Sequence, residues 1–152
     1  MTKADIVIIG SGPGGYETAA EAAAKGADVV LIERGELGGT CLNRGCIPTK
    51  ALCRSAEVAR LVKNASVFGI NAADVTLDYA RAVSRKNDIV TGLREGIAAE
   101  LSKVRVVKAD AAFTSAHTVK AGNEEFTADK IIIATGSRPA SLPVPGAELA
   151  VN

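Results

Sequence analysis

The sequence predicts an α/β fold with a parallel β-sheet, and three observations at its start support this. The run Ile6–Ile9 is continuously apolar and β-branched, which is typical of a strand buried on both faces of a parallel sheet. An Ala-rich helical segment over 14–25 ends at Gly26, and residues 28–33 form a second apolar strand. Together these elements predict one βαβ unit with a right-handed crossover.

Two further helices are predicted after this unit. Apolar residues recur at helical spacing over residues 49–63 and again from Tyr79 to Leu101. The segment 64–74 between them lacks that pattern and is predicted to be a loop. We expect the apolar side chains of the second helix to pack in the core.

A β-meander is predicted from Val104 onward, where the apolar pattern changes to a period of two. Residues 121–124 carry a hairpin-turn signal, and residues 130–137 predict a buried strand that ends in a glycine turn. The Pro-rich residues 141–152 have the composition of a linker leaving a domain formed by residues 1–140. The second crossover is therefore predicted to be a meander, not a helix.

Composition and charge argue against several classes of partner. Eighteen basic and seventeen acidic residues leave a net charge of +1, and only 3% of the residues are aromatic. Nothing therefore indicates a nucleic-acid or anionic-membrane surface. The apolar start is too short for a signal-peptide core, and no stretch approaches the roughly 18 apolar residues of a membrane span. We expect a cytoplasmic protein without nucleic-acid or membrane partners.

A glycine motif lies between the first strand and the first helix. Gly10, Gly12 and Gly15 match the pattern G-x-G-x-x-G. The first glycine allows a tight turn, the second lets the backbone approach a pyrophosphate, and the third lets the helix pack on the sheet. Glu33 ends the second strand, where an acid can bind an adenosine ribose. The motif predicts a Rossmann-like dinucleotide site but does not distinguish FAD from NAD.

Cys41 and Cys46 lie five positions apart in the stretch GGTCLNRGCIPTK. A zinc site would need four ligands, and only Cys53 and His117 remain, so we expect no metal. Plant-type iron–sulfur spacing would need a cysteine where Thr49 stands. We expect Cys53 to be a small core residue and His117 to lie in a surface hairpin.

A reversible redox couple is favoured over a structural disulfide for this pair. A bridge closing so short a loop would contribute only about 2 kcal/mol, in a compartment that reduces it. Residues five apart in an ideal α-helix have Cα atoms roughly 8.7 Å apart, so a bridge needs a distorted turn. Gly45 and Pro48 suit such a turn, and Lys50 and Arg44 should favour a thiolate. A nucleotide-binding module with two incidental, independently reacting thiols stays open as the alternative.

The cysteine motif resembles the active-site signature of the class I FAD-dependent pyridine-nucleotide disulfide oxidoreductases. That family includes dihydrolipoamide dehydrogenase, glutathione reductase and mercuric reductase. The motifs GSGPGGY near the start and ATGSRP near the end are similar to the FAD-domain motifs of the family, in the same order. The likeness covers essentially the whole chain, and GPGGY and CIPTKAL are most similar to the dihydrolipoamide dehydrogenases.

The resemblance implies a role for each residue of these motifs. Cys41 would exchange with a dithiol substrate, and Cys46 would lie against the flavin as a charge-transfer thiolate. Glu33 would bind the adenosine ribose, and Lys50 would approach the isoalloxazine ring. The implied cofactor-binding residues are Gly10, Ser11, Gly12, Pro13, Gly14, Glu33, Arg34, Gly38, Gly39, Thr40, Cys41, Lys50, Ala111, Thr135 and Gly136.

The function that the resemblance implies is that of an incomplete dihydrolipoamide dehydrogenase. It would oxidise dihydrolipoyl groups through a Cys41–Cys46 disulfide and FAD to NAD, and the fragment alone would be inactive. Its partners would be the dihydrolipoyl domain of a 2-oxoacid dehydrogenase or glycine cleavage complex and, at full length, a second copy. The linker would lead to a missing NAD-binding domain. Glutathione reductase, mercuric reductase and a non-catalytic FAD or nucleotide-binding module are the alternatives.

Overall fold

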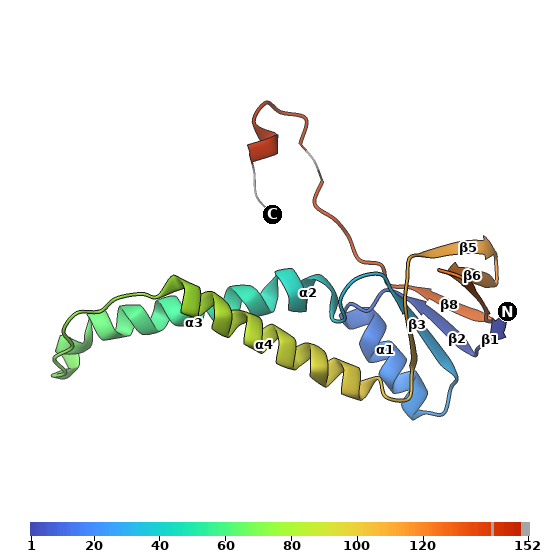
Figure 1. Ribbon diagram of the computed structural model, residues 1–152, viewed down its shortest axis with the longest axis horizontal. Helices are drawn as coiled ribbons and strands as arrows, with labels where there is room; N and C mark the ends of the chain where they lie inside the picture. Colours follow the sequence, from blue (N-terminus) through green and yellow to red (C-terminus); the bar gives the residue numbers. More distant parts are fainter. Residues whose placement is uncertain (141, 150–152) are drawn as a thin grey trace.

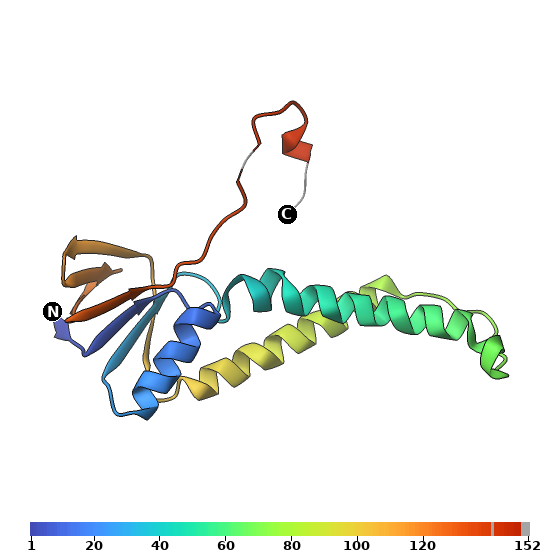
Figure 2. The same cartoon turned by 180° about the vertical axis from the view of Figure 1, so that it is seen from behind.

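A parallel sheet lies at one end of the molecule, and two long helices project from it as a hairpin (Figures 1 and 2). The computed structural model describes residues 1–140 and 142–149. The sheet order is β4-β3-β2-β8. Its strands are β2 (Ile6–Ile9), β3 (Val29–Glu33), β4 (Arg105–Lys108) and β8 (Lys130–Ile133).

The first βαβ unit is confirmed by the structure. Helix α1 (Pro13–Ala24) connects β2 to β3, which pair in parallel with Ile6 opposite Val29. The helix begins at proline, in the first turn, where the missing N–H is not needed. It ends before Gly26, whose φ of +91° is the left-handed conformation predicted for that position.

Alternate side chains of β2 and β3 enter two separate cores. Ile8 and Leu31 pack on the side of α1. Val7 and Val30 pack on the opposite side. All four are at most 1% exposed, which explains why both strands are continuously apolar instead of alternating.

The predicted β-meander covers the second core. Strands β5 (Ala111–Ser115), β6 (Thr118–Ala121) and β7 (Glu124–Thr127) pair antiparallel in sequence, and Gly122 adopts a φ of +60° in the predicted turn. A short strand that the sequence did not indicate, β1 (Thr2–Lys3), pairs in parallel with β7. Two residues are too few to show a period.

Two strand predictions need correction. We assigned the segment from Val104 to the meander, but β4 pairs in parallel with β3 and extends the main sheet. The strand predicted to be buried over 130–137 ends at Ile133, which is 65% exposed, and β8 lies at the edge of the sheet and is only partly buried. An apolar pattern identifies a strand but not the strand that it pairs with. The positions of β4 and β8 in the sheet could therefore not be predicted from the pattern.

The cysteine motif folds into two helices instead of one turn and one helix. Helix α2 (Gly39–Arg44) is followed at once by α3 (Cys46–Lys63), which starts three residues before the predicted start. Gly45 separates them with φ −122° and ψ −105°, outside the helical region. The distorted turn predicted at this glycine is therefore present.

Helix α4 (Tyr79–Glu100) packs along α3 and returns the chain to the sheet (Figure 1). The Asp78 side chain caps its N-terminus by accepting a hydrogen bond from the Arg81 N–H at 2.9 Å. Between α3 and α4, part of the predicted loop forms the 3-10 helix η1 (Ala65–Phe68). The expectation that α4 packs in the core holds for its second half, where Val90 and Ile97 are buried, whereas Tyr79 is 65% exposed.

The segment after β8 runs away from the sheet (Figure 1). Of the predicted linker 141–152, residues 141 and 150–152 lie outside the described residues, and Ala147–Leu149 forms the 3-10 helix η2. The division into a domain over 1–140 and a linker stays a prediction. Across the described residues, no helix combines the length and apolar character needed to cross a membrane.

Two neighbouring glycines provide a matched test of the packing at the start of α1. A Cβ on Gly15 would lie 1.9 Å from the Gly10 carbonyl oxygen, whereas a Cβ on Gly14 would meet nothing within 4 Å. We expect Gly15→Ala to destabilise the fold by about 3 kcal/mol through overpacking. Gly14→Ala should be neutral or stabilising by up to about 1 kcal/mol, because alanine favours the helix. Urea denaturation measures both, and equal effects would contradict this account.

Candidate functional site

The glycine turn between β2 and α1 has the tight turn predicted at Gly10 and the close packing predicted at Gly15, whereas the pyrophosphate contact of Gly12 stays a prediction. Gly10 has a φ of +99°, and a Cβ there would lie 2.4 Å from the Ala134 carbonyl oxygen. Gly15 packs on the Gly10 carbonyl, whereas Cβ atoms on Gly12 and Gly14 would meet nothing within 4 Å. The turn is therefore closed on the sheet side and open at the helix N-terminus, a shape that fits a phosphate group approaching the backbone N–H groups.

Glu33 at the end of β3 is held by three hydrogen bonds. Its Oε2 accepts from the Ser11 N–H at 2.8 Å and from the Ser11 hydroxyl at 2.7 Å. Its Oε1 accepts from the Gly35 N–H at 2.7 Å. Ser11 is fully buried, so this predicted cofactor-binding residue acts on Glu33 and does not face the cleft.

These hydrogen bonds determine the charge of Glu33. Burial alone would raise the pKa of the carboxyl, but the Ser11 hydroxyl and the N–H groups of Gly35 and Ser11 outweigh it. Arg34 adds a smaller effect in the same direction, and the pKa of Glu33 is lowered overall. Glu33 is therefore an ionised acceptor, as ribose recognition requires.

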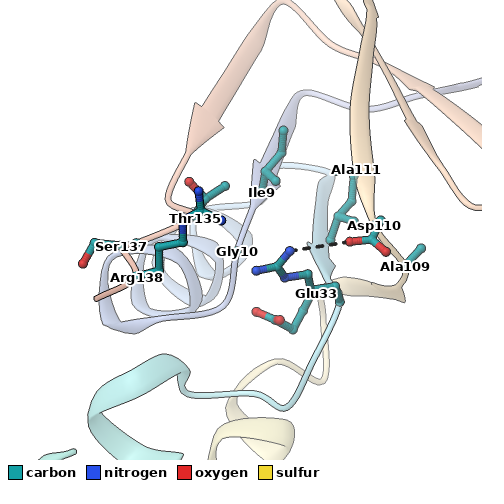
Figure 3. Close-up of a pocket in the computed structure, with 12 residues that line it drawn as sticks. Ile9, Gly10, Glu33, Ala109, Asp110, Ala111, Thr135, Ser137 and Arg138 are labelled. Atoms are coloured by element: carbon teal, nitrogen blue, oxygen red, sulfur yellow. Dashed lines mark ion pairs between the residues drawn. The ribbon is translucent and has the colours of Figure 1, made fainter. Parts of the chain in front are cut away.

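A cleft of about 310 Å³ opens beside Glu33, along the ends of β2, β3 and β8 (Figure 3). Arg34 and Asp110 both line it, and their mostly exposed side chains form an ion pair of 3.9 Å, the dashed line in Figure 3. Such a pair contributes little to stability, so both side chains can exchange it for a ligand. Six of the predicted cofactor-binding residues line this cleft, namely Gly10, Glu33, Arg34, Ala111, Thr135 and Gly136.

The start of α2 lies against the glycine turn. The Gly38 N–H donates to the Ser11 carbonyl at 2.9 Å. Gly39 has a φ of +63°, and a Cβ there would lie 2.6 Å from the Gly12 Cα. The predicted residues Gly38 and Gly39 are thus brought next to Gly12, with Thr40 following in the first turn of α2.

Cys41 and Cys46 are brought together by the break between α2 and α3. Cys41 is half-buried in α2, Cys46 is the exposed first residue of α3, and both are free thiols. Gly45 permits the close turn, since a Cβ there would lie 3.2 Å from the Thr40 carbonyl oxygen. The two sulfur atoms are therefore positioned to interact directly.

The pKa of the Cys41 thiol is raised, first by its interaction with the Cys46 side chain and then by burial. Lys50 on α3 opposes this but is the smallest contribution. A thiolate is therefore not favoured at Cys41, because the neighbouring sulfur has a larger effect than the lysine. The thiolate expected for the cysteine near a helix start stays a prediction.

Cys41 also lies in the wall of a second cavity, of about 270 Å³, between α1, α2 and α4. The lining is mainly apolar, and within the described residues its charged side chain is that of Glu100. Burial and the negative charges of Glu17 and Glu100 raise the pKa of Tyr16 in the same wall, so this phenol stays neutral. The full lining is Pro13, Tyr16, Gly38, Cys41, Leu42, Ile47, Leu93, Gly96, Ile97 and Glu100.

The other two candidates for sulfur or metal chemistry lie elsewhere. Cys53 is exposed on α3, so its prediction as a core residue was wrong. It lies on the outer face of a helix whose buried residue is Ala51. His117 is exposed in the turn between β5 and β6, as predicted.

Sequence reasoning missed several residues that complete these surfaces. Asn43 lies between the two cysteines, and its side chain bonds to Arg94 of α4. The position of Asn43 inside the cysteine motif was a usable signal, whereas the distant Arg94 gave none. The cleft also contains Ala109, Asp110, Ser137 and Arg138.

Comparison with known proteins gives consistent matches over this whole region. Residues 4–152 match the family described as pyridine nucleotide-disulphide oxidoreductase. A dihydrolipoyl dehydrogenase of Chlorobaculum parvum is 44% identical over 146 residues, which cover 91% of this chain and 31% of that protein. A dihydrolipoyl dehydrogenase of Bacillus subtilis is 43% identical, over 91% of this chain and 32% of that protein.

A solved structure is similar over nearly the full chain. It is the Cu(II) complex of the HOCl-induced flavoprotein disulfide reductase RclA from Escherichia coli, with a TM-score of 0.79 and 34% sequence identity. The match covers 96% of this chain and 31% of that one. The chain therefore spans about a third of the length of these relatives.

The hydrogen bonds to Glu33 predict a specific dependence of stability on pH. Because the folded pKa is lowered, the stabilisation is complete above about pH 4.3, the ordinary value, and is lost as the pH falls through the folded pKa. Glu33→Gln should be less stable at neutral pH and lose less stability in acid than the unmodified protein. Urea midpoints across a pH series measure this. Glu125→Gln, at an exposed position of β7, should leave the profile unchanged.

Proposed function

Because the chain belongs to the family of pyridine nucleotide-disulphide oxidoreductases, we propose that it forms the first part of a dihydrolipoamide dehydrogenase. In this proposal the Cys41–Cys46 pair oxidises dihydrolipoyl groups, and NAD is the final electron acceptor. One observation carries it: Cys41 lies in the wall of an apolar cavity and is close enough to Cys46 for that side chain to raise the pKa of its thiol. A sulfur exposed to a substrate on one side and to a second sulfur on the other is the arrangement that thiol–disulfide exchange requires.

The residues of the glycine turn and the cleft fit the FAD of this family. We assign the adenosine end to the cleft beside Glu33 and Ala111, and the pyrophosphate to the open N-terminus of α1 at Gly12. Lys50 is assigned to the flavin end. FAD would supply the acceptance of two electrons from the reduced cysteine pair and their transfer to the nicotinamide. Residues 1–140 then form the first segment of the FAD-binding domain.

The cysteines perform the exchange in two balanced steps. A substrate thiolate attacks Cys41 in the oxidised pair, so the Cys41–Cys46 bond breaks, a bond from Cys41 to the substrate forms, and Cys46 leaves as a thiolate. The second substrate thiol attacks the substrate sulfur of that mixed disulfide, and its proton passes to Cys41, which leaves as a thiol. The substrate closes as a cyclic disulfide. Counted from its dithiol, the substrate loses two electrons to the cysteine pair and two protons, one to solvent when the attacking thiolate forms and one to Cys41.

The cavity beside Cys41 favours a lipoyl group over glutathione. A dihydrolipoyl amide is an uncharged aliphatic chain with two thiols, which suits apolar walls such as Leu42, Ile47 and Ile97. Glutathione carries two carboxylates and a net negative charge, which Glu100 would repel. The charge of this lining therefore supports the lipoyl substrate class.

The activity and the partners belong to the whole protein. A dihydrolipoyl group reaches such an enzyme on a carrier, so we propose as partner the dihydrolipoyl domain of a 2-oxoacid dehydrogenase or glycine cleavage complex. We also propose a homodimer for the full-length protein, as the sequence resemblance implied. A cytoplasmic location stays a prediction from the sequence.

The role of the two cysteines can be tested by anaerobic reduction of the FAD-loaded, full-length protein. We expect one equivalent of dihydrolipoamide to reduce the cysteine pair and to produce a long-wavelength charge-transfer absorption from the Cys46 thiolate beside the flavin, and Cys41→Ser and Cys46→Ser each to slow this by at least about 1000-fold. Cys53→Ser, the matched control, should react within about twofold of the unmodified protein. Rapid appearance of this absorption in Cys41→Ser, or its absence in the unmodified protein, would contradict the proposal. Bound flavin that no dithiol reduces would instead indicate a plain binding module.

The charge of the cavity can be tested with two substrates that differ by one carboxylate. Glu100→Lys should raise kcat/KM for anionic dihydrolipoate, relative to neutral dihydrolipoamide, by about fivefold at low salt. Added salt should shrink the change, since the charges are exposed. Glu95→Lys on the same helix, outside the cavity lining, is the control and should leave the ratio unchanged. A ratio unaffected by Glu100→Lys would show that the carboxylate does not select the substrate.

A further inference from the structure

Arg94 of α4 reaches across to the helix that carries Cys41. Its Nε donates to Oδ1 of Asn43 at 2.7 Å, joining residues 51 positions apart in the sequence. The Arg94 side chain is 33% exposed, so the bond is partly shielded from water. A hydrogen bond from a charged donor in such a setting is stronger than one between neutral groups.

The Asn43 side chain uses both of its N–H donors and its oxygen around one turn. Its Nδ2 donates to the Leu37 carbonyl and to the Gly39 carbonyl, both at 2.9 Å. The oxygen on the other side of the amide is the one that accepts from Arg94. The amide makes all three bonds in one orientation, with its nitrogen towards the two carbonyls and its oxygen towards Arg94, so the guanidinium stabilises that orientation.

The turn that Asn43 encloses is the start of α2. Gly38 and Gly39 have consecutive positive φ values of +94° and +63°. Gly38 donates to the Ser11 carbonyl, and Gly39 packs on Gly12. The Asn43 bonds therefore fix where α2 begins relative to the glycine turn, and Cys41 follows two residues after Gly39.

We propose that Arg94 is a positioning residue for Cys41. It orients the Asn43 amide, which closes the turn at Gly38 and Gly39 and so fixes the Cys41 sulfur between Cys46 and the cavity. The catalytic consequence rests on the proposed function, whereas the positioning itself does not.

Arg94 has a second contact that gives a competing explanation. Its Nη1 lies 3.4 Å from Oε2 of Glu36, whose other oxygen lies 3.3 Å from Lys108 Nζ. Glu36 is 54% exposed and Lys108 is 69% exposed, so these ion pairs are screened and weak. The Asn43 bond is the stronger and more buried contact, and it is the one that touches the cysteine helix.

The first test measures the position of Cys41 without relying on turnover. The FAD-loaded, full-length protein is reduced with dithiothreitol and labelled with iodoacetamide, and mass spectrometry gives the labelling rate of Cys41 relative to exposed Cys53. Arg94→Leu should raise this ratio about fivefold, because a loosened α2 exposes Cys41 and separates it from Cys46. Asn43→Ala should do the same, and the double variant should be no larger than either single one. Because Cys53 is already exposed, global unfolding would also raise this ratio, so each variant must first show the far-UV circular dichroism and flavin content of the unmodified protein.

Three comparisons decide between the two contacts of Arg94. Glu36→Gln and Arg81→Leu, the latter an exposed arginine near the far end of α4, should each keep the labelling ratio within about twofold of the unmodified protein. Arg94→Gln keeps a donor for Asn43 and should restore most of the unmodified ratio, which also covers the case in which Arg94→Leu fails to fold. An unchanged ratio in Arg94→Leu, an effect of Glu36→Gln as large as that of Arg94→Leu, or additive effects of Arg94→Leu and Asn43→Ala would overturn the proposal.

A second measurement separates this proposal from the proposed function. Arg94→Leu should slow flavin reduction by dihydrolipoamide about tenfold, while NADH-driven reduction of ferricyanide, which bypasses the cysteines, stays within about twofold. Equal losses in both reactions would indicate a general structural role and overturn the positioning. If the unmodified protein does not oxidise dihydrolipoamide, the proposed function fails, and the labelling ratio still decides the role of Arg94.

Discussion

The close approach of backbone segments at the glycine turn is the constraint on which the rest of this structure depends. Gly15 lies on the Gly10 carbonyl, Gly10 lies on the Ala134 carbonyl, and Gly39 lies on Gly12, each closer than any side chain would permit. These contacts bring α1, the end of β8 and the start of α2 to a single point. No Cβ can be accommodated there. The cleft beside Glu33 and the cysteine pair, which lie on either side of the turn, are therefore held at a fixed distance from each other.

Two polar side chains hold the groups that lie on either side of this glycine turn. On the sheet side, Ser11 fixes the Glu33 carboxylate with its N–H and hydroxyl. On the helical side, Asn43 fixes the start of α2 and is itself held by Arg94. In both cases a group placed to meet a ligand or a redox partner is oriented by a residue that does not face the ligand. This division of roles is typical of sites whose geometry must be set before binding.

The sequence was sufficient wherever local pattern and backbone chemistry decide the outcome. The first βαβ unit and the packing roles of Gly10 and Gly15 are confirmed, and the match over residues 4–152 confirms the resemblance to a family of disulfide oxidoreductases. It was insufficient where distant segments meet. The pairing of β4 with β3 and the Arg94–Asn43 bond join residues with no shared period, and the pKa of Cys41 depends on a sulfur placed by tertiary structure.

The single glycine between α2 and α3 sets the spacing of the cysteine pair by the direction in which α3 leaves it. Cys46 begins a helix of 18 residues, which at 1.5 Å per residue is about 27 Å long. Because α3 packs along α4, the long helical hairpin holds this direction, and the distance between the two sulfur atoms is maintained by packing far from either of them.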